Sequence, residues 1–255
     1  MVIKKFIAAS LIGATSALCW AQENPSALPE PRVVVESKIN KGDLPYRSLY
    51  KMYQRLLSFM PPPPRIIEPV NQLSFTDLPI KDEDNFLKLS WNVAIVGTDT
   101  DIDIPTLRGG YFTFPAYGDK LAKDANLMFN SQTKKNFLRV AWKMPLHPNQ
   151  ALGFAEMKQA LHEVREVQKN IPWYSIGWRP EKYARFDAIK ACFAEDNGEL
   201  RLDGEALNTI HSARCRIYKI DPRLIDTTRE VNFSPAPEIV VLEDSARYLA
   251  RPAGG

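Results

Sequence analysis

The residues best suited to contact a ligand form one short aromatic and basic segment. Four aromatic side chains and one guanidinium lie within eleven residues: Trp173, Tyr174, Trp178, Arg179 and Tyr183. Flat aromatic faces beside a cation can stack on a sugar ring or hold an extended peptide. The same aromatics could instead fix a loop to the core, because such side chains are as common in cores as in binding sites. The segment is our candidate ligand-binding site, and its burial is left open.

An acidic run is the sharpest local pattern for a metal ion. Asp99, Asp101 and Asp103 alternate with other residues, so their carboxylates would share one face of a strand or surround a cation in a loop. Calcium takes roughly six to eight oxygen ligands, and three carboxylates would begin such a site. The run departs from an EF-hand loop, because isoleucine stands at its sixth position and glycine at its twelfth. An edge strand that carries charges against aggregation explains the same residues.

The sequence motifs of common hydrolases and nucleotide-binding proteins are absent. His162-Glu163 lacks the second histidine of a zinc-binding H-E-x-x-H helix. There is no G-x-S-x-G nucleophile motif, no P-loop and no dinucleotide-binding glycine pattern. A Ser-His-Asp triad could assemble from distant residues, but surface positions explain His147, His162 and His211 equally well. We therefore name no catalytic residue and expect no cofactor other than the calcium considered above.

Two cysteines, Cys192 and Cys215, follow the N-terminal leader described below. In an oxidising compartment an isolated pair is more often a disulfide than a metal site or a reactive thiol. Both lie in apolar, strand-like stretches. A bridge between them would close a loop of about two dozen residues and stabilise the fold by about 3 kcal/mol. The alternative is a pair of buried free thiols.

The N-terminal residues predict export. Lys4 and Lys5 precede thirteen mostly apolar residues, 6–18, and small residues at Cys19 and Ala21 occupy the two positions that signal peptidase reads. The apolar run is shorter than the roughly 20 residues that a bilayer requires. The residue before Cys19 is leucine, whereas a lipoprotein signal needs a small residue there. We predict that residues 1–21 are a signal peptide, cleaved near Ala21, and that the mature chain is periplasmic or secreted.

The charge of the chain limits its partners. The 33 Lys and Arg against 30 Asp and Glu give a net charge of +3, and removing the two leader lysines lowers it to +1. A nearly neutral chain lacks the basic surplus typical of nucleic-acid binding. No second apolar run is long enough to span a membrane. The partners that we expect are an envelope protein, a peptide or a saccharide.

Helical periodicity indicates two amphipathic helices. Residues 22–42 contain three prolines among polar residues and read as an extended lead-in. Apolar residues at steps of three and four then predict a helix over 43–60, with Asp43 as its cap and Pro45 in its first turn. The four prolines that follow would end it. The same spacing predicts a second helix over 153–169.

Strand signals occupy the rest of the chain, over 66–144 and 186–243, and turn signals recur about every ten residues. This spacing favours an antiparallel sheet or sandwich over a doubly wound sheet. The prediction is a single α+β domain over 43–250, in which two amphipathic helices cover the sheet, followed by a disordered tail over 251–255. The predicted strands are 87–95, 99–104, 111–114, 125–129, 137–144, 186–193, 199–202, 213–220, 230–233 and 238–242.

Three features resemble uncharacterised secreted proteins of Gram-negative bacteria. They are the Leu44-Pro45-Tyr46 helix start, the Gly-Gly-Tyr-Phe-Thr-Phe-Pro segment at 109–115 and the late cysteine-bearing strands. The resemblance extends over the mature chain without a catalytic motif, so it implies no particular activity. We predict an exported, non-enzymatic envelope accessory or ligand-binding protein. The alternative is a periplasmic hydrolase of cell-wall or sugar polymers, which needs two facing carboxylates in a cleft.

Overall fold

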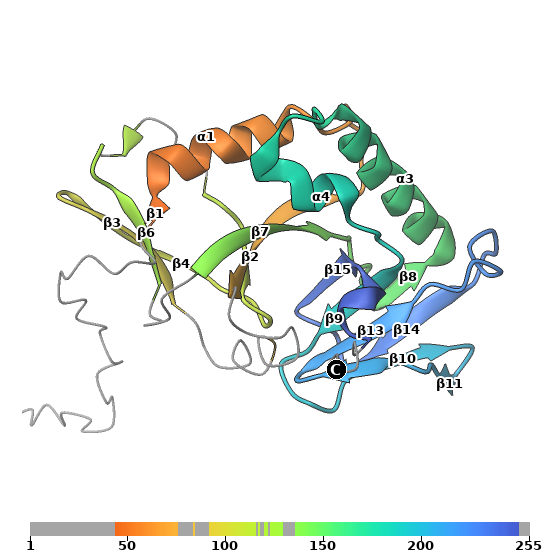
Figure 1. Ribbon diagram of the computed structural model, residues 1–255. Coiled ribbons are helices and arrows are strands. Elements are labelled where there is room, and N and C mark those ends of the chain that lie inside the picture. Colours follow the sequence, from red (N-terminus) through yellow and green to blue (C-terminus); the bar gives the residue numbers. More distant parts are fainter. Residues whose placement is uncertain are drawn as a thin grey trace, which may run out of the picture. The chain divides into compact units, whose positions relative to one another are not determined.

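Antiparallel sheets and a few helices make up the described part of the chain (Figure 1). The computed structural model describes residues 44–75, 84, 92–115, 117, 120–121, 123–129 and 136–249. The predicted signal peptide, lead-in and tail lie outside these residues. Three sheets and the helices α1, α3 and α4 confirm the predicted α+β class.

The largest sheet has seven strands, and every pairing that the structure describes in it is antiparallel. Its strands are, in spatial order, β12 (Ile210–Ser212), β13 (Cys215–Lys219), β9 (Ala188–Cys192), β15 (Ile239–Glu243), β7 (Asn136–Lys143), β2 (Glu68–Phe75) and β5 (Tyr111–Phe112). The β2–β7 pair is the longest of these ladders, and runs in register from Glu68 opposite Lys143 to Phe75 opposite Asn136. It provides a long platform for the helices.

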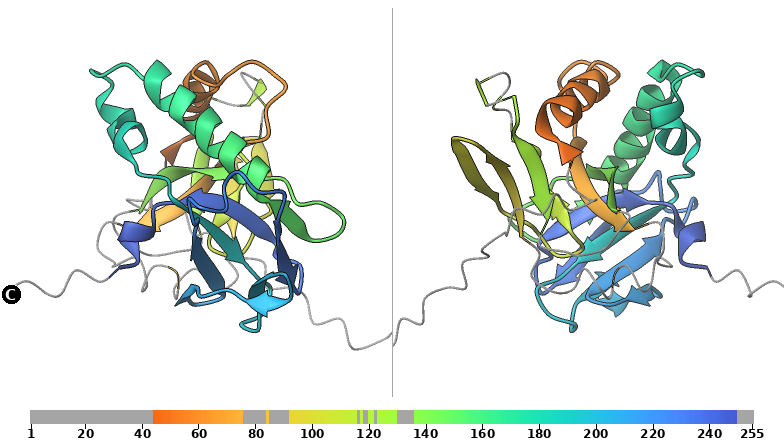
Figure 2. Two further views of the ribbon diagram at one scale, coloured as in Figure 1. Left: turned by 90° about the vertical axis from the view of Figure 1, so that its right-hand side faces the viewer. Right: turned by 60° about the vertical axis from the view of Figure 1, so that its left-hand side comes forward.

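Two four-stranded sheets flank the seven-stranded sheet (Figure 2). One consists of β1 (Leu44–Pro45), β6 (Asn126–Phe129), β3 (Val93–Gly97) and β4 (Thr100–Ile104). The other consists of β11 (Glu205–Ala206), β10 (Glu199–Leu202), β14 (Glu230–Ser234) and β8 (Ala151–Gly153). Of the predicted strand over 87–95, residues 87–91 lie outside the described part, and β3 begins at Val93 and continues to Gly97.

Helix α1 (Tyr46–Leu57) lies within the predicted helix but is shorter at both ends. The N-cap is Pro45, not Asp43, and it makes no side-chain capping bond. The amide of Tyr46 instead donates to the carbonyl oxygen of Ala125, the residue just before the neighbouring strand β6, at 3.0 Å. This tertiary hydrogen bond therefore satisfies the first amide of the helix, in place of the side-chain cap that the sequence predicts. The helix ends at Leu57, before the proline run.

Helix α3 (Phe154–Asn170) matches the second predicted helix within one residue. Its buried face, which includes Phe154, Met157 and Val164, packs against the seven-stranded sheet in the main core. Buried Glu163 lies on the same helix, and its carboxylate accepts bonds from the amides of Ile66 and Ile67 at the entry to β2. The helix thus fixes the start of the platform strand.

The core has two main apolar clusters. The helix α3 cluster joins α3 to β7, β9, β10, β14 and β15. The helix α1 cluster joins the start of α1 to β3, β6 and the ends of β2 and β7. Strand β7 contributes to both clusters, with Val140 and Trp142 in the α3 cluster and Leu138 against the α1 cluster, so it connects the two halves of the described fold.

Cys192 and Cys215 form a disulfide between neighbouring strands, as predicted. The two residues lie directly opposite each other in the β9–β13 pair, and both are buried. Their side chains pack with Val70, Tyr111 and Val241 in a small cluster. The bridge therefore ties two strands that the ladder already joins.

Removing this disulfide should destabilise the fold. We expect the double variant Cys192→Ala/Cys215→Ala to lose about 3 kcal/mol of unfolding free energy, because the bridge closes a chain separation of 23 residues. Urea unfolding measures the loss, and the reduced wild type serves as the control, with a similar loss. Thiol titration of the denatured, unreduced mature protein should find no free thiol. Two reactive thiols would contradict the bridge.

Candidate functional site

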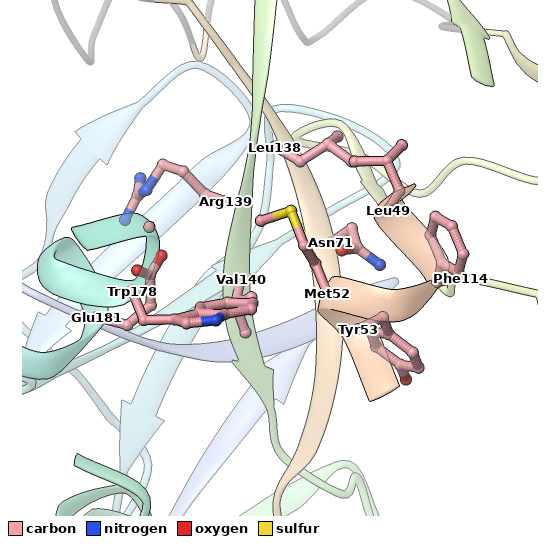
Figure 3. A pocket seen from close by; sticks show the side chains of 11 residues that line it. Leu49, Met52, Tyr53, Asn71, Phe114, Leu138, Arg139, Val140, Trp178 and Glu181 are labelled. Atoms are coloured by element: carbon pink, nitrogen blue, oxygen red, sulfur yellow. The ribbon is translucent and has the colours of Figure 1, made fainter. Parts of the chain in front are cut away.

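A cleft opens between α1 and the short helices η2 (Ile176–Trp178) and α4 (Arg179–Tyr183), with β2 and β7 as its floor (Figure 3). It encloses a cavity of about 60 Å³ and opens to solvent at its mouth. Ligand sites usually span roughly 300–1,000 Å³, so the cavity has room for one small group of a ligand, and the rest of the ligand would lie in the open mouth. Its lining residues are Leu49, Met52, Tyr53, Asn71, Phe114, Leu138, Arg139, Val140, Gly177, Trp178 and Glu181.

An aromatic stack builds the wall on the α1 side. Tyr46, Tyr50 and Tyr53 recur at steps of four and three, so one face of the helix presents all three rings. They stack around Phe114, whose ring centroid lies 5.3 Å from that of Tyr46 and 5.5 Å from that of Tyr53. The Tyr46 hydroxyl donates to the carbonyl oxygen of Pro115 at 2.9 Å and anchors the stack.

Contacts to α3 hold the opposite wall in place. The side-chain amide of Gln168 donates to the carbonyl oxygens of Glu181 and Ala184, at 2.8 and 2.9 Å. The Lys182 ammonium returns bonds to two carbonyl oxygens at the end of α3. These bonds satisfy backbone groups at helix ends and fix α4, which positions Trp178 and Glu181 at the cleft.

Three polar side chains lie among the apolar residues of the cleft. Asn71 is only 6% exposed, and its amide nitrogen Nδ2 has no acceptor among the described residues. Burial raises the pKa of Glu181, although backbone amides and the positive charge of Arg139 oppose the shift. Arg139 also faces Glu243, with Nη2 3.9 Å from Oε1. The cleft therefore offers two donors without a partner among the described residues, Nδ2 of Asn71 and Nη1 of Arg139, and only the arginine is engaged with carboxylates.

The residues of the predicted aromatic segment differ in burial. Trp173 and Tyr174 are 80% and 63% exposed, with ring centroids 5.8 Å apart, and Tyr183 is exposed as well. Trp178 is 8% exposed, belongs to the α3 cluster and lines the cleft. The predicted loop over 173–178 contains the turn of η2, and Arg179 begins α4. Of the four predicted aromatic residues, Trp178 alone is among the residues that line the cleft, and the side chain of Arg179 lies outside the described part.

The three aspartates of the acidic run lie on the β3–β4 hairpin. Asp99 is exposed in the turn, and Asp101 and Asp103 are exposed on β4, which is the edge strand of its sheet. Thr98 bonds Asp124 through its amide at 3.0 Å. Across the described residues, no three His, Cys, Asp or Glu side chains come together as a metal site. The arrangement gives the calcium interpretation no support and fits a charged edge strand.

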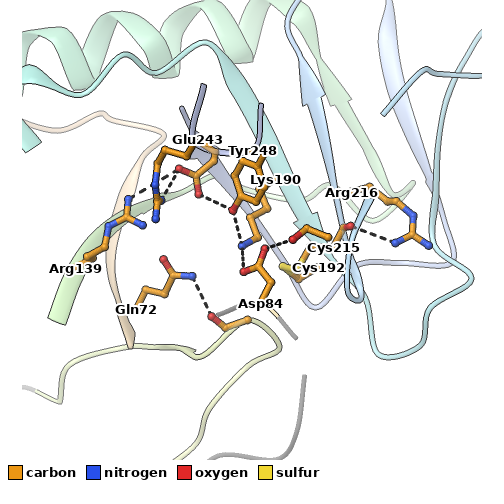
Figure 4. Close-up of polar contacts among 12 residues, drawn as sticks. Gln72, Asp84, Arg139, Lys190, Cys192, Cys215, Arg216, Glu243 and Tyr248 are labelled. Atoms are coloured by element: carbon orange, nitrogen blue, oxygen red, sulfur yellow. Dashed lines mark hydrogen bonds and ion pairs between the residues drawn. A yellow bond between two sulfur atoms is a disulfide. The ribbon is translucent and has the colours of Figure 1, made fainter. Parts of the chain in front are cut away.

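A second polar cluster surrounds Lys190, which is completely buried on β9 (Figure 4). Its ammonium donates to Asp84 Oδ1 at 2.6 Å and to the Tyr248 hydroxyl at 2.9 Å. The Ser212 hydroxyl donates to the other Asp84 oxygen at 2.6 Å. The Tyr248 hydroxyl donates to Glu243, which also accepts a bond from Arg247.

The charges of this cluster compensate one another. Burial alone would lower the pKa of Lys190, but the negative charge of Asp84 and its neighbours holds it well above the usual value. Burial would likewise raise the pKa of Glu243, yet Arg247, Arg139 and Lys190 lower it. Burial also raises the pKa of Tyr111, whose ring lies beside Lys190, to about 12. The side chains of Lys190, Asp84 and Ser212 are buried, so we assign the cluster a structural role.

Sequence reasoning missed the polar residues of the cleft. Asn71, Arg139 and Glu181 come from three elements, and each is ordinary in its local sequence. The one available signal is the Asn71-Gln72 pair within a strand, because strands place such residues in the core only with partners. His147, His162 and His211 are all exposed, in line with surface positions.

The fold and the cleft define an α+β protein with a largely apolar cleft that opens to solvent. No family model matches the chain, and no curated protein or solved structure shows significant similarity to it. Among the described residues, no helix combines the length and the apolar character that crossing a bilayer requires.

Proposed function

We propose that the protein is an exported, non-enzymatic ligand-binding protein of the cell envelope, and that its site is the cleft between α1 and α4. The observation that carries this proposal is the composition of the cleft. Aromatic and aliphatic side chains from α1, β7 and η2 form its walls, and three polar side chains lie among them. Such a lining is typical of sites that bind small apolar molecules. The export part of the proposal rests on the leader over 1–21.

The alternative function, hydrolysis of cell-wall or sugar polymers, finds less support at this site. A glycoside hydrolase uses two carboxyl groups on either side of the scissile bond. Among the residues that line the cleft, Glu181 is the single carboxylate. Its raised pKa suits a proton donor, but the lining supplies no second carboxylate as base or nucleophile.

Filling the cleft should weaken the binding of an apolar probe. Gly177 lines the cleft, and a β-carbon built there has no neighbour within 4 Å, so Gly177→Leu can begin its side chain without a clash and adds bulk at the cleft. We expect N-phenyl-1-naphthylamine, a neutral dye that fluoresces in apolar surroundings, to bind the protein from the periplasmic fraction. Its affinity should fall at least about tenfold in Gly177→Leu, since the added side chain occupies the apolar space.

Gly177→Ala is the matched control, because it makes the same change of backbone freedom and leaves the cleft open. It should bind the dye as the wild type does. Equal affinity in all three proteins would place the dye elsewhere, and no binding to the wild type would remove the support for a ligand-binding function.

A further inference from the structure

We propose that the cleft recognises an apolar ligand through an uncharged carbonyl group, as in an amide or ester, which accepts a hydrogen bond from Asn71. This inference rests on the ligand-binding function proposed above, and it names the chemical class of the ligand. Its basis is a buried donor that the described protein does not satisfy.

Asn71 is held rigidly at the floor of the cleft. It lies within the β2–β7 ladder, directly opposite Val140, so its backbone position is fixed. Figure 3 shows its amide nitrogen on the side of the cleft formed by Phe114 and Tyr53. Nδ2 is buried and has no acceptor among the described residues. A leucine would fill this position without the free-energy penalty of an unpaired buried donor. The polar residue is therefore explained by an acceptor on a ligand.

The neighbouring residue shows how the same strand satisfies its other buried amide. Gln72 is 1% exposed and points to the opposite face of the sheet, where its Nε2 donates to the carbonyl oxygen of Gly109 at 3.1 Å. The protein thus supplies an acceptor for Gln72 and, among the described residues, none for Nδ2 of Asn71. The amide without an acceptor is the one that lines the cleft.

The charges around the cleft favour a neutral acceptor over a carboxylate. Glu181 lies beside Trp178 on the side of the cleft away from Asn71 (Figure 3). Burial already disfavours its negative charge, as its raised pKa shows. Arg139 Nη1 also lacks a partner, but this guanidinium faces the carboxylates of both Glu181 and Glu243. An anionic ligand would therefore add a negative charge that no unengaged cation among the described lining residues balances.

The walls indicate the rest of the ligand. Rings of Tyr53 and Phe114 lie on the side of the cleft near Asn71, and the ring of Trp178 lies on the other side (Figure 3). Leu49 and Leu138 complete the apolar lining. Offset or edge-on contacts with such rings suit a planar or branched apolar body. The ligand class is thus an apolar amide or ester, such as a hydrophobic acyl or peptidyl group.

Three probes with one aromatic body test this inference: 2-acetylnaphthalene carries a neutral carbonyl, 2-ethylnaphthalene carries none, and 2-naphthoate carries an anion. We expect the wild type to bind the acetyl probe about tenfold more tightly than either of the others. In Asn71→Leu the acetyl and ethyl probes should bind equally. In the wild type, the ¹⁵N–¹H signals of the Asn71 side-chain amide should shift with the acetyl probe and much less with the ethyl probe.

A thermal melt separates this role from a structural one. Asn71→Leu should raise the melting temperature of the free protein, because it removes an unpaired buried amide. Gln72→Leu is the control: it should lower the melting temperature, since the Gly109 carbonyl loses its donor, and it should keep the preference for the acetyl probe.

Several outcomes would contradict the inference. Equal binding of the acetyl and ethyl probes to the wild type, a preference that persists in Asn71→Leu, or tightest binding of naphthoate would overturn the carbonyl inference and leave the ligand-binding function intact. Failure of all three probes and of the dye would overturn both. If Asn71→Leu does not fold, the amide signals of the wild type still decide the question.

Discussion

Replacing Lys190 with methionine is expected to lower the free energy of unfolding by about 3–5 kcal/mol, because it leaves the Asp84 carboxylate buried without its cation. Denaturant unfolding at pH 7 measures this loss. Lys190 has a raised pKa, so its stabilising contribution is complete below its ordinary pKa and declines only as the pH rises toward its folded-state value. At pH 7 the lysine is charged in the folded and unfolded chain alike.

Two further variants test the explanation. Lys219→Met removes an ammonium on β13 that is 65% exposed and 3.5 Å from Asp187, and it should change stability by less than about 1 kcal/mol. The double variant Lys190→Met/Asp84→Leu removes both buried charges and should recover much of the loss. If Lys190→Met costs no more than Lys219→Met, then the Lys190–Asp84 pair is not buried in solution.

Replacing Trp178 with alanine is expected to destabilise the fold by about 3–5 kcal/mol, the usual cost of emptying a site that a buried tryptophan fills. Trp178 packs in the α3 cluster and also forms one wall of the cleft. Dye binding should weaken in the same variant, measured at a temperature well below its melting point. One side chain therefore serves both stability and binding.

Trp173→Ala provides the matched comparison, because it removes the same side chain from a position five residues away that is 80% exposed. Its effect on stability should stay within about 0.5 kcal/mol, and its affinity for the dye should equal that of the wild type. Equal losses in the two variants would show that Trp178 is not part of the core.

Periodicity in the sequence was enough to predict the two long helices. Apolar residues at helical spacing defined α1 and α3, since their buried faces meet the sheet through a regular stripe. The boundary of α1 was wrong, because the carbonyl of Ala125, just before β6 and far along the chain, accepts the first helical amide. A local capping rule has no information about such a partner.

Strand β2 shows why the sequence did not predict every strand of the seven-stranded sheet. Its sequence, Glu-Pro-Val-Asn-Gln-Leu-Ser-Phe, lacks a clear alternation because Asn71, Gln72 and Ser74 are buried along with the apolar residues. Burial on both faces removes the polar face on which period-two patterns depend. Lys190 is a similar case, because only the distant Asp84 makes its burial possible.

The cleft itself was beyond sequence reasoning for a topological reason. Its walls bring together α1, the long β2–β7 ladder and α4, and α1 and α4 are separated by more than a hundred residues in the chain. Trp178 was identified because it lies in an aromatic segment. For Asn71 the sequence offers only the Asn71-Gln72 pair within a strand, and its proposed role rests on the lack of an acceptor for Nδ2 among the described residues, which no sequence pattern shows.

The cleft lies where the two apolar clusters meet. Phe114 and Leu138 on its lining belong with the α1 cluster, whereas Val140 and Trp178 belong to the α3 cluster, and Tyr53 contacts both. A molecule in the cleft would be packed by both clusters at once. Local opening of either cluster would then break contacts with the ligand. A bound ligand would therefore couple the local unfolding of the two clusters, so that they open as one cooperative unit. Backbone amides of β3 and α3, on opposite sides of the site, would gain protection from hydrogen exchange together, although neither touches the ligand.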